Sequence, residues 1–460
     1  MQTTDKDNFL RAEAELVLDQ ARKVKSERIK DLGSPIQLPG VALDIHIRGK
    51  FAWIAENTAV VRKVDLETSK TVQLFRGHTA PTTAIAFYDK VPGSGDEGLL
   101  ISGSWDKVGD QALILSEILK RCIEYQYMGY RGPPPFIPSS LSFVETSQSK
   151  RMLSSTPAHA DFVKSLLVIP SLCLLVSTSS DKIVRFWDLS SFEEGKPLNS
   201  AGSISAHTRP VEALTAQSVS KTSTILYTAD TMGIIKVWEL QLETGPSPRW
   251  RSTLKEELTY HRTRVNEILH GNGQLWSASS DDTVQVHDDL PSTERNVKPM
   301  PPITHPAAVR AVLPLSTTVI AEPYLLTGSG DIIRAYDVSS PDEPELLGET
   351  DAHWHDVIAL RLWMRKTAVG GEPGKIKVEP WIVSTSLDGT LRRWRLAGSC
   401  YIEYDQFDCL VRTAIELLNP PPKPSIEEKP IVPLPEVKEE DDQFGMTEDE
   451  ERELAELMDD

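Results

Sequence analysis

Short stretches in which apolar and polar residues alternate recur along most of this chain. A typical one is residues 176–189, VSTSSDKIVRFWDL, in which the alternation runs on both sides of Ser180 and Asp181. Such alternation predicts half-buried β-strands, and a Ser-Asp pair is typical of a tight turn. We therefore expect two strands, over residues 172–177 and 182–188, joined by this turn.

The same pattern returns at residues 228–240, 278–289, 327–338 and 385–396. A histidine precedes each unit, and the histidines His78, His159, His207, His261, His305 and His353 are 81, 48, 54, 44 and 48 residues apart. A repeat period of roughly 40 to 45 residues is typical of four short strands per unit. The chain is therefore expected to be a tandem repeat of one small β unit.

The repeat resembles the WD-repeat family, whose units are four-stranded antiparallel blades of a β-propeller. The resemblance lies in the histidine, the Ser or Thr strand, the turn Asp and the Trp-Asp pair. Residues 41–65 fit a further unit that lacks the histidine. The resemblance implies an all-β fold with a seven-bladed β-propeller of WD repeats over residues 34–414.

In this family a His, a Ser or Thr, the turn Asp and a Trp form a hydrogen-bonded quartet inside the blade. The resemblance implies two complete quartets, and a third with His287 in place of Trp: His159, Ser177, Asp181 and Trp187; His353, Ser384, Asp388 and Trp394; His261, Ser277 and Asp281. Elsewhere the pattern decays, since Asp230 precedes Trp238 by eight residues instead of six, and Asp331 precedes Tyr336 by five. A buried polar group of this kind is stable only when each member is paired.

A His, an Asp and a Ser together also suggest a hydrolytic triad. Here the trio recurs at the blade period, whereas catalysis needs a single copy, so we expect a structural role. The sequence contains no phosphate-binding loop, nucleophile elbow or cysteine spacing typical of a metal site. We therefore expect no catalytic residue, no metal and no cofactor.

Residues 1–33 are expected to hold an amphipathic helix before the propeller. The apolar residues Leu10, Ala14, Val17, Ala21 and Val24 are spaced by four and three, which places them on one helical stripe. The stripe covers about two heptads, which is too short to be stable alone. It is expected either to dock on the propeller or to pair with a helix of a partner.

The second repeat contains an irregular region at residues 108–143. The 81 residues between His78 and His159 exceed the other spacings by about thirty. One interpretation is a genuine insertion, with a helix over residues 111–125 and a substitute strand near residues 141–145. The other is translated non-coding sequence, such as a retained intron, and both stay open.

Residues 415–460 differ in composition from the repeats. This segment is rich in Pro, and residues 419–460 contain 15 acidic and 4 basic residues. We expect a disordered acidic tail with a short terminal helix, which either binds a basic partner or only adds solubility. The net charge of −18 makes binding to nucleic acid or to a membrane surface unlikely, and the four scattered cysteines favour the cytoplasm or nucleus.

The resemblance implies a non-catalytic scaffold or adaptor that binds other proteins. In the family, partners bind the narrow top face, formed by the loops before each first strand and by the turns that carry Asp. The matching residues are Trp105, Phe162, Lys164, Arg209, Arg264, Asn266, Arg310, Trp354 and Asp356. Alternatives are a substrate receptor of a ubiquitin ligase, a reader of histone tails, or a propeller-based hydrolase. The hydrolase would be marked by a unique polar cluster in the central channel.

Overall fold

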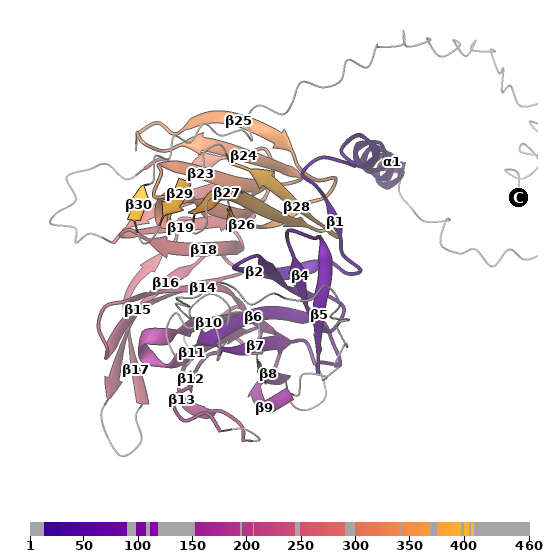
Figure 1. Ribbon diagram of the computed structural model, residues 1–460. Helices are drawn as coiled ribbons and strands as arrows, with labels where there is room; N and C mark the ends of the chain where they lie inside the picture. The colour runs from indigo at the N-terminus through magenta and orange to yellow at the C-terminus, as the bar shows by residue number, and fades with distance from the viewer. Residues whose placement is uncertain are drawn as a thin grey trace, which may run out of the picture. The chain divides into compact units, whose positions relative to one another are not determined.

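The chain folds into antiparallel sheets preceded by a helix (Figure 1). The computed structural model describes residues 13–89, 98–106, 111–117, 152–193, 196–205, 207–243, 249–289, 300–340, 342–368, 375–396, 400–403 and 406–408. Within these ranges there are seven sheets and one α-helix. The acidic segment 415–460, with its expected terminal helix, lies outside the described residues.

Six of the sheets have four consecutive strands each, and we number them blade one to blade six. Blades one and two are β2 (Ala42–Arg48), β3 (Phe51–Glu56), β4 (Val60–Asp65), β5 (Lys70–Arg76), and β6 (Thr82–Asp89), β7 (Gly98–Ser104), β8 (Gln111–Glu117), β9 (Met152–His159). Blades three and four are β10 (Val163–Ile169), β11 (Leu174–Ser179), β12 (Val184–Asp188), β13 (Asn199–Ile204), and β14 (Val211–Ser218), β15 (Ser223–Asp230), β16 (Ile235–Glu243), β17 (Arg249–Leu258). Blades five and six are β18 (Val265–Gly271), β19 (Gln274–Ser279), β20 (Thr283–Asp288), β21 (Ile303–Thr304), and β22 (Val309–Pro314), β23 (Tyr324–Ser329), β24 (Ile332–Asp337), β25 (Glu345–Asp351).

The last sheet, which we call the closing sheet, differs from the expected repeat. It contains six strands: β26 (Val357–Ala368), β27 (Lys375–Ser386), β28 (Thr390–Arg395), β1 (Ile36–Gln37), β29 (Cys400–Glu403) and β30 (Gln406–Asp408). The prediction of seven like blades is therefore corrected to six regular blades and this larger sheet. The difference arises because β27 continues beyond β28, and its extension pairs with β29 through Val378 and Cys400.

The N-terminal strand β1 supplies the outer strand beside β28, with Ile36 opposite Leu391. The first strands of successive sheets touch one another from β2 through β6, β10, β14, β18, β22 and β26, and β26 returns to β2. The ring is thus closed by joining the two ends of the repeat region, which leaves the closing sheet without an exposed β28 edge. The fold is an all-β propeller.

The hydrophobic core lies between neighbouring sheets rather than in one central mass. For example, Ile101 of blade two packs with Leu175 and Trp187 of blade three. Ile45 of blade one packs in the same way with Leu391 of the closing sheet. Each sheet buries both faces against its neighbours, which is why its middle strands are apolar on both sides.

The expected helix over residues 111–125 is wrong, because residues 111–117 form strand β8. This strand pairs on both sides, with Leu115 opposite Ile101 of β7 and Ser154 of β9. A helix here would leave the facing edges of β7 and β9 without backbone partners, so pairing overrides the local helix propensity. Residues 118–151, which include the expected strand near residues 141–145, lie outside the described residues.

The first strand of every sheet has a β-bulge close to its start. The register shifts around Leu43, Thr83, Lys164, Glu212, Asn266, Arg310 and Ile358. A bulge inserts one extra residue and changes the direction of its side chain. It thereby sets the orientation of the side chains that the top face presents.

Helix α1 (Glu13–Arg28) docks through its last turn only. The Lys25 ammonium lies 2.7 Å from a carboxylate oxygen of Asp331 and 3.0 Å from one of Asp351. The side chains of Val17 and Val24, on the expected stripe, are 62% and 64% exposed. The described part of the stripe, at Val17, Ala21 and Val24, is therefore not buried on the propeller, which leaves these side chains accessible to a partner helix. No helix in the described part of the chain has the length and apolar character needed to cross a bilayer.

Candidate protein-interaction face

Two quartets expected from the sequence come together in blade three and the closing sheet. His159 Nδ1 is 3.0 Å from Asp181 Oδ2, its Nε2 is 2.8 Å from Ser177 Oγ, and the Trp187 indole N–H donates to the same Oγ at 2.8 Å. The closing sheet repeats this geometry at 2.9, 2.8 and 2.8 Å with His353, Asp388, Ser384 and Trp394. The quartets join the loop before the first strand to the middle of the sheet.

Blade four contains a complete quartet that sequence spacing missed. His207 lies 3.3 Å from Asp230 and 2.7 Å from Thr228, and Trp238 donates to Thr228 at 2.9 Å. Asp230 is the last residue of β15, so its carboxylate reaches the histidine from two positions earlier than Asp181 does in blade three. The signal that could have found it is a histidine followed about twenty residues later by a Thr-x-Asp strand end.

Blade two holds most of a quartet as well. His78 Nδ1 is 2.8 Å from Asp106 and its Nε2 is 3.0 Å from Ser102. The Asp106 carboxylate also accepts the backbone N–H of Thr79 at 2.9 Å. The loop before β6 is therefore fixed in the same way as in blades three and four.

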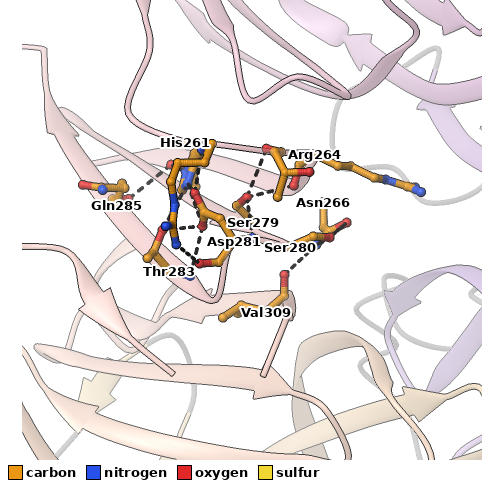
Figure 2. Close-up of polar contacts among 12 residues, drawn as sticks. His261, Arg264, Asn266, Ser279, Ser280, Asp281, Thr283, Gln285 and Val309 are labelled. Carbon is orange, nitrogen blue, oxygen red and sulfur yellow. Dashed lines mark hydrogen bonds and ion pairs between the residues drawn. The ribbon is translucent and has the colours of Figure 1, made fainter. Parts of the chain in front are cut away.

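Blade five keeps the His–Asp contact but replaces the Trp, as the sequence indicated. Figure 2 shows His261 beside Asp281 and Thr283. The Nδ1 atom of His261 lies 3.2 Å from Asp281 Oδ2, and its Nε2 atom lies 2.8 Å from Ser277 Oγ. His287, at the Trp position, instead contacts the hydroxyl of Tyr260 at 2.8 Å. The side chain of Arg264 extends away from this group (Figure 2).

Blades one and six use arginine where the quartet is incomplete. In blade one the buried Glu56 carboxylate accepts two N–H groups of Arg62. In blade six His305 contacts Thr327 at 2.9 Å, while Arg334 on the next strand pairs with Glu349 at 2.7 Å. Each substitute leaves the buried charges paired, as a low-dielectric interior requires.

The quartet of the closing sheet consists of a neutral histidine and an ionised aspartate. Burial lowers the pKa of His353 by more than its contact with Asp388 raises it. Burial opposes ionisation of Asp388, but hydrogen bonds from His353 and Thr390 bring its pKa below the ordinary value. The neutral imidazole therefore donates Nδ1–H to the carboxylate and accepts the serine hydroxyl at Nε2.

The top-face residues expected from the sequence are largely used to join neighbouring sheets. Glu212 of blade four accepts contacts from Lys164 of blade three at 3.4 Å and Arg264 of blade five at 2.9 Å. Asn266 donates to the carbonyl of Val309 in blade six at 2.7 Å. All of these side chains stand at or beside the bulges, so the bulge residues connect one sheet to the next.

The remaining junctions have different contacts of the same kind. Arg310 of blade six lies 2.8 Å from Asp356 of the closing sheet, and Thr83 of blade two donates to Val163 of blade three at 2.6 Å. Asp44 of blade one accepts the N–H of Ile85 in blade two at 2.9 Å. The bonds to Val163 and Ile85 satisfy backbone groups that the free edges of β10 and β6 would otherwise leave open.

Aromatic side chains of the top face lie at two places. The rings of Trp105 and Phe162 are 5.0 Å apart, and the Lys164 ammonium is 5.8 Å from the Trp105 ring. Trp354 lies on the closing sheet, half-buried, with its ring 6.1 Å from that of His355. Arg209, in the loop before β14, is exposed.

Comparisons with known proteins agree with this architecture. The family model described as WD domain, G-beta repeat, matches residues 150–188, the range that contains the blade-three quartet. The match and a WD repeat-containing relative support a likeness of this chain to the WD-repeat β-propeller family. An uncharacterized WD repeat-containing protein of Schizosaccharomyces pombe is 23% identical over 411 residues, which cover 87% of this chain and 91% of that protein.

A solved structure is also similar at a lower level. The crystal structure of the computationally designed Ika8 protein is 16% identical, and the alignment covers 78% of this WD-repeat chain and 98% of the designed one, with a TM-score of 0.46. This similarity is too weak to bear on the number of blades or on function.

The WD-repeat quartets resemble a Ser-His-Asp triad in their hydrogen bonds, but their serine hydroxyls are not accessible to a substrate. Ser177 and Ser384 have no exposed surface, so a substrate carbonyl cannot reach either hydroxyl. No cluster of three or more His, Cys, Asp and Glu side chains suited to a metal ion occurs among the described residues. The quartets therefore act as structural hydrogen-bond groups.

A separate polar cluster lies in the channel of this WD-repeat propeller. Arg361 of the closing sheet contacts Glu267 of blade five at 2.7 Å, across blade six, and Asp44 of blade one at 4.0 Å. These residues are far apart along the chain, so no pattern in the sequence singles them out. Such a cluster is what a propeller-based hydrolase would show.

The bonds of the channel cluster favour a structural role. Burial raises the pKa of Asp44, but His46 and Arg361 lower it further, so the carboxylate is ionised. Glu267 accepts the N–H of Val312 at 2.8 Å, and Arg361 donates to the carbonyl of Ile45 at 3.0 Å. Carboxylates held by an arginine and by backbone N–H groups are poor proton shuttles, and they fix the first strands around the channel.

Proposed function

We propose that this protein is a non-catalytic scaffold or adaptor that assembles other proteins on its top face. WD-repeat propellers generally serve as interaction scaffolds. The observation that supports the top face is a set of cationic and aromatic side chains that stay partly exposed although they also join the blades. The side chain of Arg264 is 46% exposed and that of Arg310 is 35% exposed. Arg and Trp are the residue types that contribute most to interface hot spots.

The hydrogen bonds and ion pairs between blades are a second reason to propose the top face as the binding surface. Since Lys164, Asn266 and Arg310 are already held by bonds to the next sheet, little side-chain freedom is lost when a partner binds. A preorganised surface of this kind suits repeated assembly better than a flexible loop does.

The test is affinity purification of the tagged full chain with mass spectrometry. A triple variant, Arg264→Glu, Arg310→Glu and Trp354→Ala, should lose stoichiometric partners that the unaltered protein retains, because it reverses two charges and removes one aromatic ring. The matched control is Arg249→Glu, Arg251→Glu and Val219→Ala, at the opposite ends of the strands of blade four. Thermal unfolding of each variant separates loss of binding from loss of folding.

Unchanged partners in the triple variant would contradict the role of the top face. The copurified proteins would also distinguish a substrate receptor of a ubiquitin ligase from a histone-tail reader, since ligase subunits or histones would be present. The acidic segment 415–460 is proposed as a second contact, and a chain ending at Leu418 should then lose the partners that need it. The proposed location is the cytoplasm or the nucleus.

A further inference from the structure

Three loops of the top face meet above blades four and five. The N–H of Thr231, in the turn after β15, donates to the carbonyl of Pro210 at 3.1 Å. On its other side that turn touches blade five, since a Cβ added at Gly233 would lie 2.4 Å from the carbonyl oxygen of His261. The loops that carry Arg209, Met232 and Arg262 are therefore contiguous. We call the surface formed by Arg209, Met232, Tyr260, Arg262 and Arg264 the blade four–five patch.

The patch is positively charged within an acidic protein. Arg209 and Arg262 are exposed and form no ion pair with a described residue, in a chain of net charge −18. Glu212 is shared between Arg264 and Lys164. Asp281 contacts Arg262 without an ion pair, because its carboxylate accepts the backbone N–H at 2.8 Å and its carbonyl accepts the Nη2–H at 3.4 Å. Two guanidinium groups are thus left available for an acidic partner.

The acidic residues next to the patch are also engaged. Glu256 and Glu257, near the end of β17, lie 3.7 Å from His287 and 3.2 Å from Lys236. These two acids are therefore held by residues outside the patch.

Apolar surface lies beside these cations. Met232 is 51% exposed and Tyr260 is 43% exposed. Both are held in place: the N–H of Met232 donates to Asp230 at 2.9 Å, and the Tyr260 hydroxyl contacts His287 at 2.8 Å. A fixed aromatic ring and an adaptable thioether suit an aliphatic or aromatic side chain of a partner.

We propose that the blade four–five patch binds a peptide segment of a partner in which Asp and Glu flank an aliphatic or aromatic residue. The acidic groups pair with Arg209 and Arg262, and the apolar residue rests on Met232 and Tyr260. This assignment rests on the proposed function, because it names the kind of partner that the top face takes.

The experiment is a selection of short random peptides displayed against the full chain, followed by fluorescence polarisation with the selected peptides. The enriched peptides should carry an excess of Asp and Glu around an apolar residue. The variant Arg209→Glu and Arg262→Glu should weaken their binding at least about tenfold. The variant Arg249→Glu and Arg251→Glu, with the same change in charge on the far end of β17, should leave it unchanged, and added salt should weaken it.

Several outcomes would overturn the proposal. They are enrichment of peptides without an acidic excess, equal binding by the Arg209→Glu and Arg262→Glu variant, no enrichment at all, or displacement of the peptides by a single-stranded oligonucleotide. The copurification experiment tests the scaffold function separately, so its failure can be distinguished from the failure of the acidic-peptide proposal. If partners depend on the top face but no acidic peptide binds, the scaffold stands and this partner class is wrong.

Discussion

Blade three and the closing sheet have complete quartets, whereas blade six has lost its carboxylate. In blade three Asp181 accepts His159 at 3.0 Å, but in blade six His305 Nδ1 faces only the carbonyl of Ile303, at 3.2 Å. Asp331, in the corresponding turn of blade six, pairs with Lys25 of α1 instead. The comparison teaches that sheet pairing and apolar packing hold a blade, and that the turn Asp can be redirected to hold another element.

The largest effect is expected where the turn carboxylate is buried. Asp388→Ala should lower the free energy of unfolding by about 3 kcal/mol, since buried donors of His353 and Thr390 lose their acceptor. Asp331→Ala, in the turn of blade six, should cost at most about 1 kcal/mol, because it removes one partly exposed ion pair, with Lys25. Thermal and urea unfolding of both variants measures the difference. Equal losses would mean that the two turns are equivalent.

A pH effect of similar size is expected in blade six. Burial, together with the charge of Arg334, lowers the pKa of His305 to about 4. The unfolded chain takes up this proton below about pH 6.5 and the folded chain does not, so the contribution is complete above that pH and is lost as the pH falls toward 4. Near pH 4 the loss amounts to about 2 to 3 kcal/mol.

The control for this effect is His305→Gln, which removes the titrating group. Its free energy of unfolding should depend less on pH than that of the unaltered protein between pH 6.5 and about 4. All other ionisable groups are the same in both proteins, so only the difference between the two curves is informative. Parallel curves would show that folding does not lower the pKa of His305.

A smaller contrast is expected at the hydroxyl in the centre of the quartet. Ser177→Ala should cost about 2 kcal/mol, because both the Trp187 indole and His159 lose a partner. Thr327→Val in blade six should cost about 1 kcal/mol, because only His305 contacts that hydroxyl. Chemical denaturation of each variant provides the numbers. A larger loss in blade six would reverse the ranking of the blades.

Much of the blade pattern could be predicted, because it rests on local spacing. The strands of blade three, and the quartets around His159 and His353, follow from alternation and from a turn four residues after the serine. Spacing failed for Asp230, whose carboxylate reaches His207 from a different backbone position. It failed also for residues 111–117, because β8 pairs not only with the preceding strand β7 but also with β9, which lies much further along the chain.

The sequence by itself determined the strands, the turns and the identity of the buried polar groups, since these depend on residues close together in the chain. Only the tertiary structure decided that β1 closes the ring, that Lys164, Asn266 and Arg310 join neighbouring sheets, and that Arg361 reaches Glu267 across the channel. Those contacts join different sheets. Their distances are set by the closure of the ring and by the bulges, which alternation along a single strand does not encode.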